Sequence, residues 1–306
     1  MKVLVTGGAG FIGSHLVEAL LRAHYQVFVI DDLSSGKRSQ VPAPALFYKL
    51  DIRSPKLQQL LVRLKPDYIC HLAAQKSVAR SHQDVAFDAS VNIVGSINIL
   101  EAIKNLELKK FLFVSTGAVY GDPREIPTPE TSEFQLTSPY ALSKHTLENY
   151  LNYFSREYGV ANVVVRPANV YGPRQVHDAE GGVVAQFSRN LLTSGTVTIE
   201  GKGDQTRDFI YVGDVAAGII AAMVKGSGVY NLSTARDVSI RELLVEMGKV
   251  ANIIPQVNYA PPRPADIKRS ALSPRRAERE LDWKPQVPLV DGLGLTIRWF
   301  KDNLKV

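Results

Sequence analysis

The stretch that decides the fold is Val3-Leu4-Val5-Thr6-Gly7-Gly8-Ala9-Gly10-Phe11-Ile12-Gly13, in which an apolar run turns through glycines into the start of a helix. The apolar, β-branched residues predict a buried strand. Gly7 permits a tight turn, Gly10 lets the backbone approach a phosphate group, and Gly13 lets the helix pack closely on the strand. Because the first amides of a helix favour an anion, the spacing indicates a strand–turn–helix unit that binds a pyrophosphate.

An acidic residue follows the strand–turn–helix unit at the position where a dinucleotide-binding fold has one. A second apolar run, Val27 to Ile30, ends in Asp31, eighteen residues after Gly13. An acidic residue about 20 residues beyond the glycines typically accepts hydrogen bonds from the ribose of a dinucleotide. Its charge would repel a 2′-phosphate, so we expect NAD rather than NADP, although the bases Lys37 and Arg38 follow closely.

Apolar runs alternate with helical patterns along the first half of the chain. Such alternation predicts an α/β fold with a doubly wound parallel sheet. Ligands bind such sheets at the carboxyl ends of the strands. The strands are expected at Val27 to Ile30, Leu46 to Leu50, Tyr68 to Leu72, Lys110 to Ser115 and Asn162 to Arg166, with helices such as Ser14 to Arg22 and Asp84 to Asn105 between them.

After Pro167 the pattern changes to irregular segments rich in Gly and Pro, with short helices. We expect a first domain over residues 1–170 and a smaller mixed α/β domain over residues 171–306. Residues 207–232 show a strand, helix, strand pattern and are expected to rejoin the first sheet. The short helices are expected at Val183 to Leu192, Ile240 to Asn252, Ala277 to Leu281 and Asp291 to Lys301.

The composition is that of an ordinary globular chain of 306 residues, 45% hydrophobic and 22% charged. The net charge is +6, but the basic residues are scattered among acids, which argues against a nucleic-acid partner. No stretch approaches the roughly 18 apolar residues of a membrane span, so we expect a soluble, cytoplasmic protein without a membrane partner. The single cysteine, Cys70, is expected to be a buried thiol, and the six histidines show no metal-ligand spacing.

The segment Ser138-Pro139-Tyr140-Ala141-Leu142-Ser143-Lys144 carries a candidate acid/base pair. Ser138 is typical of an N-cap and Pro139 of the first helical residue, so Tyr140 and Lys144, four apart, lie on one helix face. A phenol has an ordinary pKa of about 10, and a neighbouring ammonium favours the phenolate. The spacing therefore predicts a tyrosine base assisted by a lysine.

Eight motifs, in chain order, together resemble the extended short-chain dehydrogenase/reductase family, and most of all its bacterial UDP-glucose 4-epimerases. The resemblance covers the whole chain and implies a Rossmann fold and NAD as cofactor. The motifs are Gly7 to Gly13, Asp31-Asp32-Leu33, Asp51-Ile52, His71-Leu72-Ala73-Ala74, Val91 to Gly95, Val114-Ser115-Thr116, Tyr140 with Lys144, and Arg207 to Val212, and the tail Arg263-Pro264-Ala265-Asp266 matches as well.

The resemblance also implies the site residues. Tyr140 takes the proton of the 4-hydroxyl of a UDP-bound hexose, Lys144 lowers the pKa of Tyr140 and holds the nicotinamide ribose, and Thr116 hydrogen-bonds O4, with Ser115 as the second choice. The implied UDP-sugar-binding residues are Thr116, Asn169, Val183, Arg207, Arg263, Asp266 and Ser270. The implied NAD-binding residues are Gly7, Gly10, Phe11, Ile12, Gly13, Asp31, Asp32, Leu33, Ser35, Gly36, Asp51, Ile52, Leu72, Ala73, Ala74, Lys76, Asn92, Ser115, Tyr140, Lys144 and Pro167.

The residues that follow Thr116 distinguish the reactions of the resembling enzymes. A 4,6-dehydratase would need an Asp-Glu pair there, but the chain has Gly117 and Ala118, and the glutamate usual in a hexuronate decarboxylase is missing before Val119. The cysteine acid of a 3,5-epimerase/reductase is missing too, because Cys70 lies upstream. The resemblance therefore implies NAD-dependent 4-epimerisation of a UDP-hexose through a 4-keto intermediate.

Two alternatives stay open. One is a 4-epimerase of UDP-hexuronates, although Asp178 and Glu180 would repel a carboxylate. The other is a non-catalytic NAD(H)-binding regulator, which would have no need of Thr116, Tyr140 and Lys144. Both belong to the same fold, so only the site can decide between them.

Two further properties rest on the resemblance. The fourth residue beyond the uridine-binding aspartate acts as a size gate, and here it is Ser270, whose small side chain implies that UDP-N-acetylhexosamines are accepted too. Two helical stretches, Phe87 to Lys104 and Tyr140 to Arg156, would lie side by side and form a homodimer bundle. Ile93, Ile97 and Leu100 recur at helical spacing, which suits either an interface or an internal core.

Overall fold

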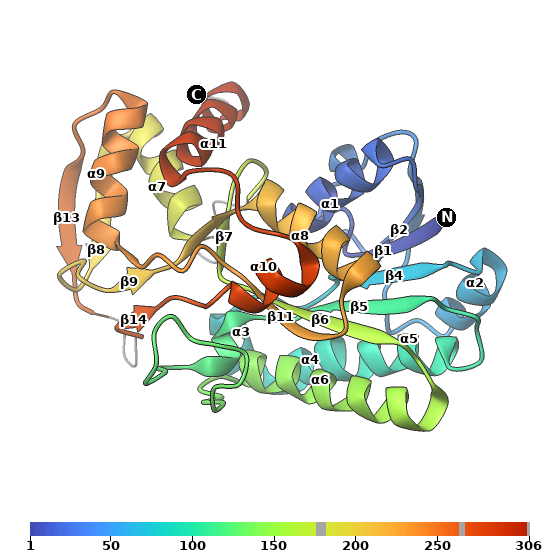
Figure 1. Ribbon diagram of the computed structural model, residues 1–306. Helices are drawn as coiled ribbons and strands as arrows, with labels where there is room; N and C mark the ends of the chain where they lie inside the picture. Colours follow the sequence, from blue (N-terminus) through green and yellow to red (C-terminus); the bar gives the residue numbers. More distant parts are fainter. Residues whose placement is uncertain (176–181, 263–266, 305–306) are drawn as a thin grey trace.

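The computed structural model describes residues 1–175, 182–262 and 267–304 (Figure 1). A parallel seven-stranded sheet in the order β11-β6-β5-β4-β1-β2-β3 forms its centre. The strand order reverses between β1 and β4, so the predicted doubly wound sheet is confirmed. The strands are β1 (Lys2–Thr6), β2 (Gln26–Asp31), β3 (Leu46–Lys49), β4 (Tyr68–His71), β5 (Lys110–Val114), β6 (Asn162–Pro167) and β11 (Gly228–Leu232).

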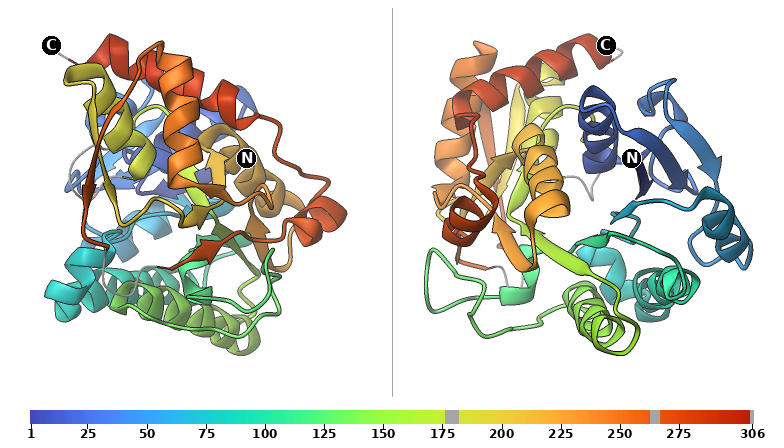
Figure 2. Two further views of the ribbon diagram at one scale, coloured as in Figure 1. Left: turned by 90° about the vertical axis from the view of Figure 1, so that its left-hand side faces the viewer. Right: turned by 45° about the vertical axis from the view of Figure 1, so that its right-hand side comes forward.

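Helices cover both faces of this sheet, as the two views of Figure 2 show. Successive side chains of a strand point to opposite faces. In β1, Val3 and Val5 therefore join one apolar layer and Leu4 the other. The first layer includes α1 (Phe11–Arg22) and α8 (Val212–Lys225), and the second includes α2 (Lys56–Leu64), α5 (Gly95–Ile103) and α6 (Pro139–Tyr158).

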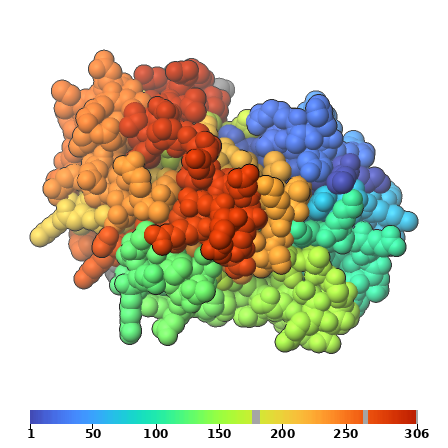
Figure 3. Space-filling view, in the orientation of Figure 1, coloured from blue at the N-terminus to red at the C-terminus, as the bar shows by residue number. Residues whose placement is uncertain are grey.

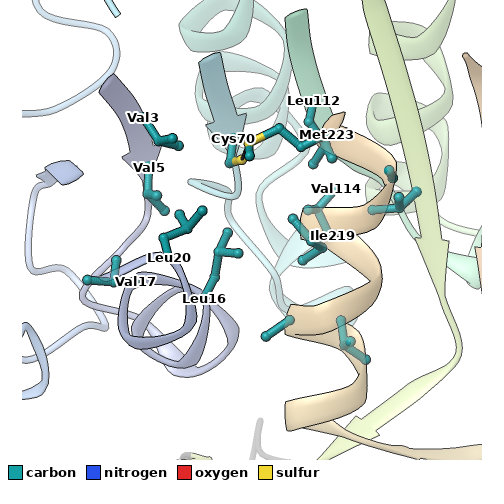
Figure 4. Close-up of a cluster of buried hydrophobic side chains, with 14 of the residues drawn as sticks. Val3, Val5, Leu16, Val17, Leu20, Cys70, Leu112, Val114, Ile219 and Met223 are labelled. Atoms are coloured by element: carbon teal, nitrogen blue, oxygen red, sulfur yellow. Dashed lines mark hydrogen bonds between the residues drawn. The ribbon is translucent and has the colours of Figure 1, made fainter. Parts of the chain in front are cut away.

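The only cysteine lies in the first layer. Cys70, on β4, is fully buried, and its Sγ lies 3.7 Å from Sδ of Met223 on α8 (Figure 4). Burial in this apolar layer raises the pKa of the thiol to about 12. The prediction of a buried thiol is therefore confirmed.

The helix predicted from Asp84 to Asn105 is interrupted. It consists of α4 (Val85–Ala89), a π-helical segment (Ser90–Val94) and α5, and it follows the short α3 (Val78–Gln83). By length and composition alone, Val85–Ile103 is apolar enough to cross a membrane, and 44% of its 18-residue window is buried inside the protein. Core helices of soluble proteins pass the same test, so this stretch does not decide the expectation of a protein without a membrane span.

The part of the chain after β6 has an apolar cluster of its own, separate from both layers of the large sheet. The four short helices predicted here are present. Their bounds, with those of the small strands, are β7 (Asn169–Tyr171), α7 (Val183–Thr193), β8 (Thr196–Glu200), β9 (Thr206–Arg207), β10 (Phe209–Tyr211), β12 (Val238–Ser239), α9 (Ile240–Ala251), β13 (Gln256–Ala260), β14 (Arg269–Ser270), α10 (Arg275–Leu281) and α11 (Leu289–Asn303).

The segment predicted to rejoin the large sheet does so only at its end. β11 pairs with β6 in that sheet, whereas β10 pairs with β7 and β9 lies between β12 and β14. Figure 3 shows the early part of the chain, in blue, at one side of this face and an orange part of the later chain at the other side, with the red residues of the last part between them.

Candidate active site

Helix α6 carries the predicted acid/base pair. As the sequence indicates, the Ser138 side chain accepts a hydrogen bond from the amide of Ala141 (3.1 Å), and Pro139 is the first helical residue. Tyr140 is half-buried and Lys144, one turn further, is buried. The start of α6 therefore places both side chains beside the carboxyl end of β5, where a ligand of such a sheet binds.

The side-chain partner of Tyr140 is Thr116, the second residue after the end of β5. Burial raises the pKa of the phenol to about 12, and the hydrogen bond with Thr116 acts against this rise. Thr116 also accepts a hydrogen bond from the amide of Ala118 (3.1 Å), which caps the short 3₁₀ turn Gly117–Tyr120. The threonine hydroxyl is thus held by its own turn and lies next to the tyrosine hydroxyl.

The ammonium of Lys144 donates to the carbonyl oxygen of Val114 (2.8 Å) and lies 4.5 Å from the centre of the Phe113 ring. Burial lowers the pKa of Lys144 to about 7, although the carboxylates of Glu148 and Asp88 act in the opposite direction. We expected Lys144 to lower the pKa of the tyrosine. In this structure the pKa of the phenol is instead raised, because burial dominates and the ammonium is directed at a carbonyl.

Ser115 and Thr116 are adjacent, but their hydroxyls have different partners. Ser115 is buried, and its Oγ donates to Oε1 of Glu148 (2.5 Å) on α6. Of Ser115 and Thr116, only Thr116 contacts Tyr140. The geometry therefore favours Thr116 over Ser115 as the partner of a substrate oxygen at Tyr140.

The glycine turn after β1 leaves room for a phosphate group. A side-chain carbon added at Gly10 would meet only the carbonyl oxygen of Gly7, at 3.2 Å, besides its chain neighbours and its own helix. By contrast, one added at Gly13 would lie 2.1 Å from that oxygen, and one at Gly7 2.6 Å from the amide of Ala73. The turn is therefore tight on its protein side and open at Gly10, where the amides of α1 begin.

Asp31, at the end of β2, is fixed against the same turn. Its carboxylate accepts hydrogen bonds from the amides of Ala9 and Leu33, both at 2.9 Å. Burial raises the pKa of this carboxyl, and the two hydrogen bonds act in the opposite direction. The loop that follows returns to the glycine turn, because the amide of Lys37 donates to the carbonyl of Ala9 (3.0 Å) and Gly36 packs on Ala9.

The loops after β3 and β4 complete this edge of the sheet. Asp51 accepts hydrogen bonds from Arg53, which lower the pKa of its carboxyl, and the amides of Leu72 and Ala73 both donate to Oγ1 of Thr6 (3.2 Å each). The structure thus brings the predicted NAD-binding residues of four loops to one edge. These loops contain Gly7 to Gly13, Asp31 to Gly36, Asp51 with Ile52, and Leu72 to Lys76.

Asn92, in the π-helical segment, links three elements of the site. Its amide oxygen accepts from the amide of Gln75 (2.8 Å), and its Nδ2 donates to the carbonyl of Gln75 (3.0 Å), to Asp88 (3.1 Å) and to Ser143 (3.2 Å). Because π-helical turns often occur at functional sites, the interruption of this helix is consistent with a role for Asn92. The sequence pattern did not indicate that Asp88 and Gln75 belong to this site.

A cavity of about 140 Å³ opens beside Thr116. It brings together the predicted residues Pro167, Asn169, Arg207 and Ser270, and Ser270 on β14 is paired with Arg207 on β9. The complete lining is Thr116, Gly117, Ala118, Pro167, Ala168, Asn169, Arg207, Ile267, Ser270 and Leu272. A larger cavity of about 580 Å³, between α1, residues 37–42 and α11, contains none of the predicted site residues.

Residues 3–233 match the NAD dependent epimerase/dehydratase family. The chain belongs to this family. The UDP-glucose 4-epimerase of Mycolicibacterium smegmatis is 40% identical to it over 311 residues, with 99% of each chain covered. The structure of the UDP-glucose 4-epimerase of Thermotoga maritima with UDP-glucose is 42% identical, with 100% of both chains covered and a TM-score of 0.97.

A further neighbour of this family member acts on a different sugar nucleotide. It is the UDP-N-acetylglucosamine 4-epimerase of Methanobrevibacter ruminantium M1, 34% identical with 99% of both chains covered and a TM-score of 0.95, solved in complex with UDP-N-acetylmuramic acid. The predicted resemblance to bacterial UDP-glucose 4-epimerases is thus confirmed by the family match and by these relatives.

Some of the predicted site residues of this epimerase/dehydratase family member are not described. Arg263 and Asp266 lie outside the described residues, as do Asp178 and Glu180, the two acids that argue against a hexuronate substrate. Val183 begins α7, as predicted, but does not line the cavity at Thr116. Within residues 1–175, 182–262 and 267–304, no group of three His, Cys, Asp or Glu side chains could hold a metal ion.

Proposed function

We propose that this protein is an NAD-dependent 4-epimerase of UDP-hexoses that interconverts UDP-glucose and UDP-galactose. One observation carries the proposal: Thr116, the side-chain partner of Tyr140, lines a cavity whose described lining contains no carboxylate, imidazole, amine or thiol. A dehydratase or decarboxylase would need such a second acid or base next to the sugar. With Tyr140 alone, oxidation at C4 and its reversal are the chemistry that remains.

The residues present fit NAD. The open face of Gly10 accepts the pyrophosphate, and the fixed carboxylate of Asp31 suits a ribose with free hydroxyls. Asp51 with Ile52 would face the adenine end, and Asn92 and Lys76 the nicotinamide end. When bound, NAD accepts the hydride from C4 of the sugar and later returns it.

The chain's own residues supply the proton transfer and the binding of the UDP group. Tyr140 removes the proton of the 4-hydroxyl and later gives it back, while Thr116 hydrogen-bonds O4 and orients it. Arg207 and Arg263 would hold the phosphates with planar forked donors, Asp266 the uridine ribose, and Asn169 and Val183 the remaining UDP groups. The 4-keto sugar must turn its other face to the cofactor, so the lining around it has to hold it weakly.

We also propose that the protein accepts UDP-N-acetylhexosamines. Ser270 lines the cavity with Thr116 and is paired with Arg207, which supports a gate at this position beside the sugar. Its small side chain leaves space for a 2-acetamido group. Residues 1–170 with β11 would then serve as the cofactor domain and most of the later part as the nucleotide-sugar domain, consistent with the separate apolar cluster there.

A homodimer, in the cytoplasm, completes the proposal. α5 and α6 lie side by side on one face of the sheet, as predicted. Of the three positions considered from the sequence, Leu100 is buried in the internal core and Ile93 and Ile97 are half-buried. The outer faces instead expose apolar side chains, which suit a helical interface: Val94, Leu142, Tyr150 and Tyr153.

A product analysis tests the function. The purified protein is incubated with UDP-glucose, UDP-N-acetylglucosamine and UDP-glucuronate separately, and the products are resolved by chromatography. We expect UDP-galactose and UDP-N-acetylgalactosamine from the first two and no change of the third. Conversion of UDP-glucuronate alone would replace the proposal by the hexuronate epimerase, and no conversion of any sugar would favour a binding protein.

A further inference from the structure

A buried polar network lies behind the catalytic pair and takes no part in the chemistry proposed above. We call it the Glu148 network, and its centre is an ion pair between Glu148 on α6 and Arg166 on β6, exposed by only 4% and 2%. Its other members are Ser115, Tyr120 and Asn231.

Hydrogen bonds link the members of the network one after another. Oε1 of Glu148 accepts from Ser115 Oγ (2.5 Å) and from Nε of Arg166 (3.0 Å), and the second oxygen is paired with Nη2 of the same arginine. Nη1 of Arg166 donates to the hydroxyl of Tyr120 (2.7 Å), which donates to Asn231 on β11 (2.9 Å). Burial alone would raise the pKa of Glu148, but His145, whose Nδ1 lies 3.7 Å from Oε2, and the hydrogen bonds from Arg166 and Ser115 lower it to about 2.

Stability does not explain a pair of this kind. The cost of removing two charges from water often equals or exceeds their attraction, and apolar replacements of a buried pair are often neutral or stabilising. A buried pair does hold two elements in one relative position, since breaking it leaves an unpaired charge in the interior.

Glu148 and Lys144 are one turn apart on α6, and both contact the end of β5. Lys144 donates to the carbonyl of Val114, and Glu148 accepts from the hydroxyl of Ser115, the next residue. α6 is thus attached to β5 at two successive residues. Tyr140 lies one further turn toward the start of α6, and Thr116 one residue further along the strand, so the same attachment sets the approach of these two hydroxyls.

We propose that Glu148, held by Arg166, is a positioning residue for catalysis: it fixes how α6 lies on the end of β5, and it withholds the Ser115 hydroxyl from the sugar. The inference rests on the proposed function, because the side chains that Glu148 would position are Tyr140 and Thr116, whose roles belong to that function. A displacement of about 1 Å can reduce a rate by about 100-fold, so a residue that touches neither sugar nor cofactor can matter this much.

The network also affects the charge on Lys144. The ionisable groups that face Lys144 are Glu148 and Tyr140 on its own helix, Asp88 on α4 and His71 on β4, and burial keeps His71 neutral, with a pKa of about 3. Of the carboxylates, only Glu148 is paired with an arginine. Removing its charge leaves Asp88 to support the ammonium, so the pKa of Lys144 should fall further.

The test uses Glu148→Gln, which keeps the shape and removes the charge, and Glu148→Asp, which keeps the charge and withdraws it from Ser115 by one methylene. Asp214→Asn is the matched control, because Asp214 is a buried carboxylate on α8 that accepts from the amide of Val287 (3.0 Å), away from the site. We measure kcat and KM for UDP-glucose between pH 6 and 9, the melting temperature, and the pKa of Lys144 by NMR with ¹³C-labelled lysine.

We expect Glu148→Gln to lower kcat at least tenfold with KM within threefold, to move the high-pH decline of kcat to lower pH, and to lower the pKa of Lys144. Glu148→Asp should lower kcat without moving that pKa, and it decides the matter if the glutamine variant does not fold. Asp214→Asn should lower the melting temperature only. Unchanged kcat in the Glu148 variants, or a loss of kcat that the control shares in proportion to its fall in melting temperature, would overturn the inference.

The NMR titration needs no sugar. A wild-type protein that converts no UDP-sugar would reject the proposed function, while an unaltered pKa of Lys144 in Glu148→Gln would reject this inference separately.

Discussion

Tyr140, at the start of α6, has as its side-chain partner Thr116, the second residue after β5. The two residues are 24 positions apart in the sequence. Their contact brings a candidate base and a candidate hydrogen-bond donor to the same substrate oxygen. Ser115, next to Thr116, is turned to Glu148 instead. A substrate hydroxyl at this point would therefore contact the hydroxyl of Thr116 and the phenol of Tyr140.

The first prediction concerns the phenol. Tyr140→Phe should lower turnover at least 100-fold, in line with the roughly 10²- to 10⁴-fold effect of a positioned acid or base. The ring remains, so NAD should stay bound, which absorbance and release of the cofactor after denaturation can measure. Turnover within threefold of the wild type would remove Tyr140 from the mechanism.

The second prediction concerns the cofactor. Because epimerisation regenerates NAD in each turnover, the purified protein should retain NAD and need no added reductant. The carboxylate of Asp31, fixed by the amides of Ala9 and Leu33, should exclude NADP. Reconstitution of the stripped protein with each cofactor checks this. A requirement for a continuous supply of NADPH, with a reduced sugar as product, would indicate a reductase.

The third prediction concerns sugar size. Ser270→Tyr should abolish conversion of UDP-N-acetylglucosamine and leave that of UDP-glucose, because a tyrosine would fill the space beside the sugar. The two substrates, assayed on one preparation, control for each other. Equal loss of both activities, or a parent that ignores the acetamido sugar, would show that Ser270 is not the gate.

The fourth prediction concerns acid stability. The pKa of Glu148 is lowered from its ordinary 4.5 to about 2 in the folded protein, so its contribution to stability is complete above about pH 4.5 and is lost as the pH falls toward 2. The difference in free energy of unfolding between the wild type and Glu148→Gln should therefore shrink from pH 6 to pH 3. Urea titrations at both values measure it, and a difference independent of pH would contradict the assignment.

The fifth prediction concerns assembly. Leu142, on the outer face of α6, is 52% exposed, and Leu142→Asp should convert a dimer to a monomer, because it places a charge in an apolar interface. Val245→Asp on α9 is the matched control, since Val245 is 51% exposed on another surface. Sedimentation velocity distinguishes the states. A wild-type monomer, or dimers of equal strength in both variants, would place the interface elsewhere.

Much of the site could be predicted because its signals are local. Ser138 and Pro139 mark a helix start through their own backbone chemistry, and the glycines after β1 follow from the turn and the close packing required there. The interruption at Ser90–Val94 was missed, because apolar periodicity looks alike in an α-helix and in one with a π-helical segment. Glu148 could have been noticed, since it continues the four-residue spacing of Tyr140 and Lys144.

By itself the sequence determined the alternation of strands and helices, the pyrophosphate turn, the Asp31 carboxylate and the Tyr140–Lys144 spacing, because each depends on neighbouring residues. Only the tertiary structure decided that Thr116 rather than Ser115 meets Tyr140, that Ser270 is paired with Arg207, and that Glu148 is paired with Arg166. These relations join segments far apart in the chain. They depend on how strands pair and how α6 lies on the sheet, and no local pattern encodes either.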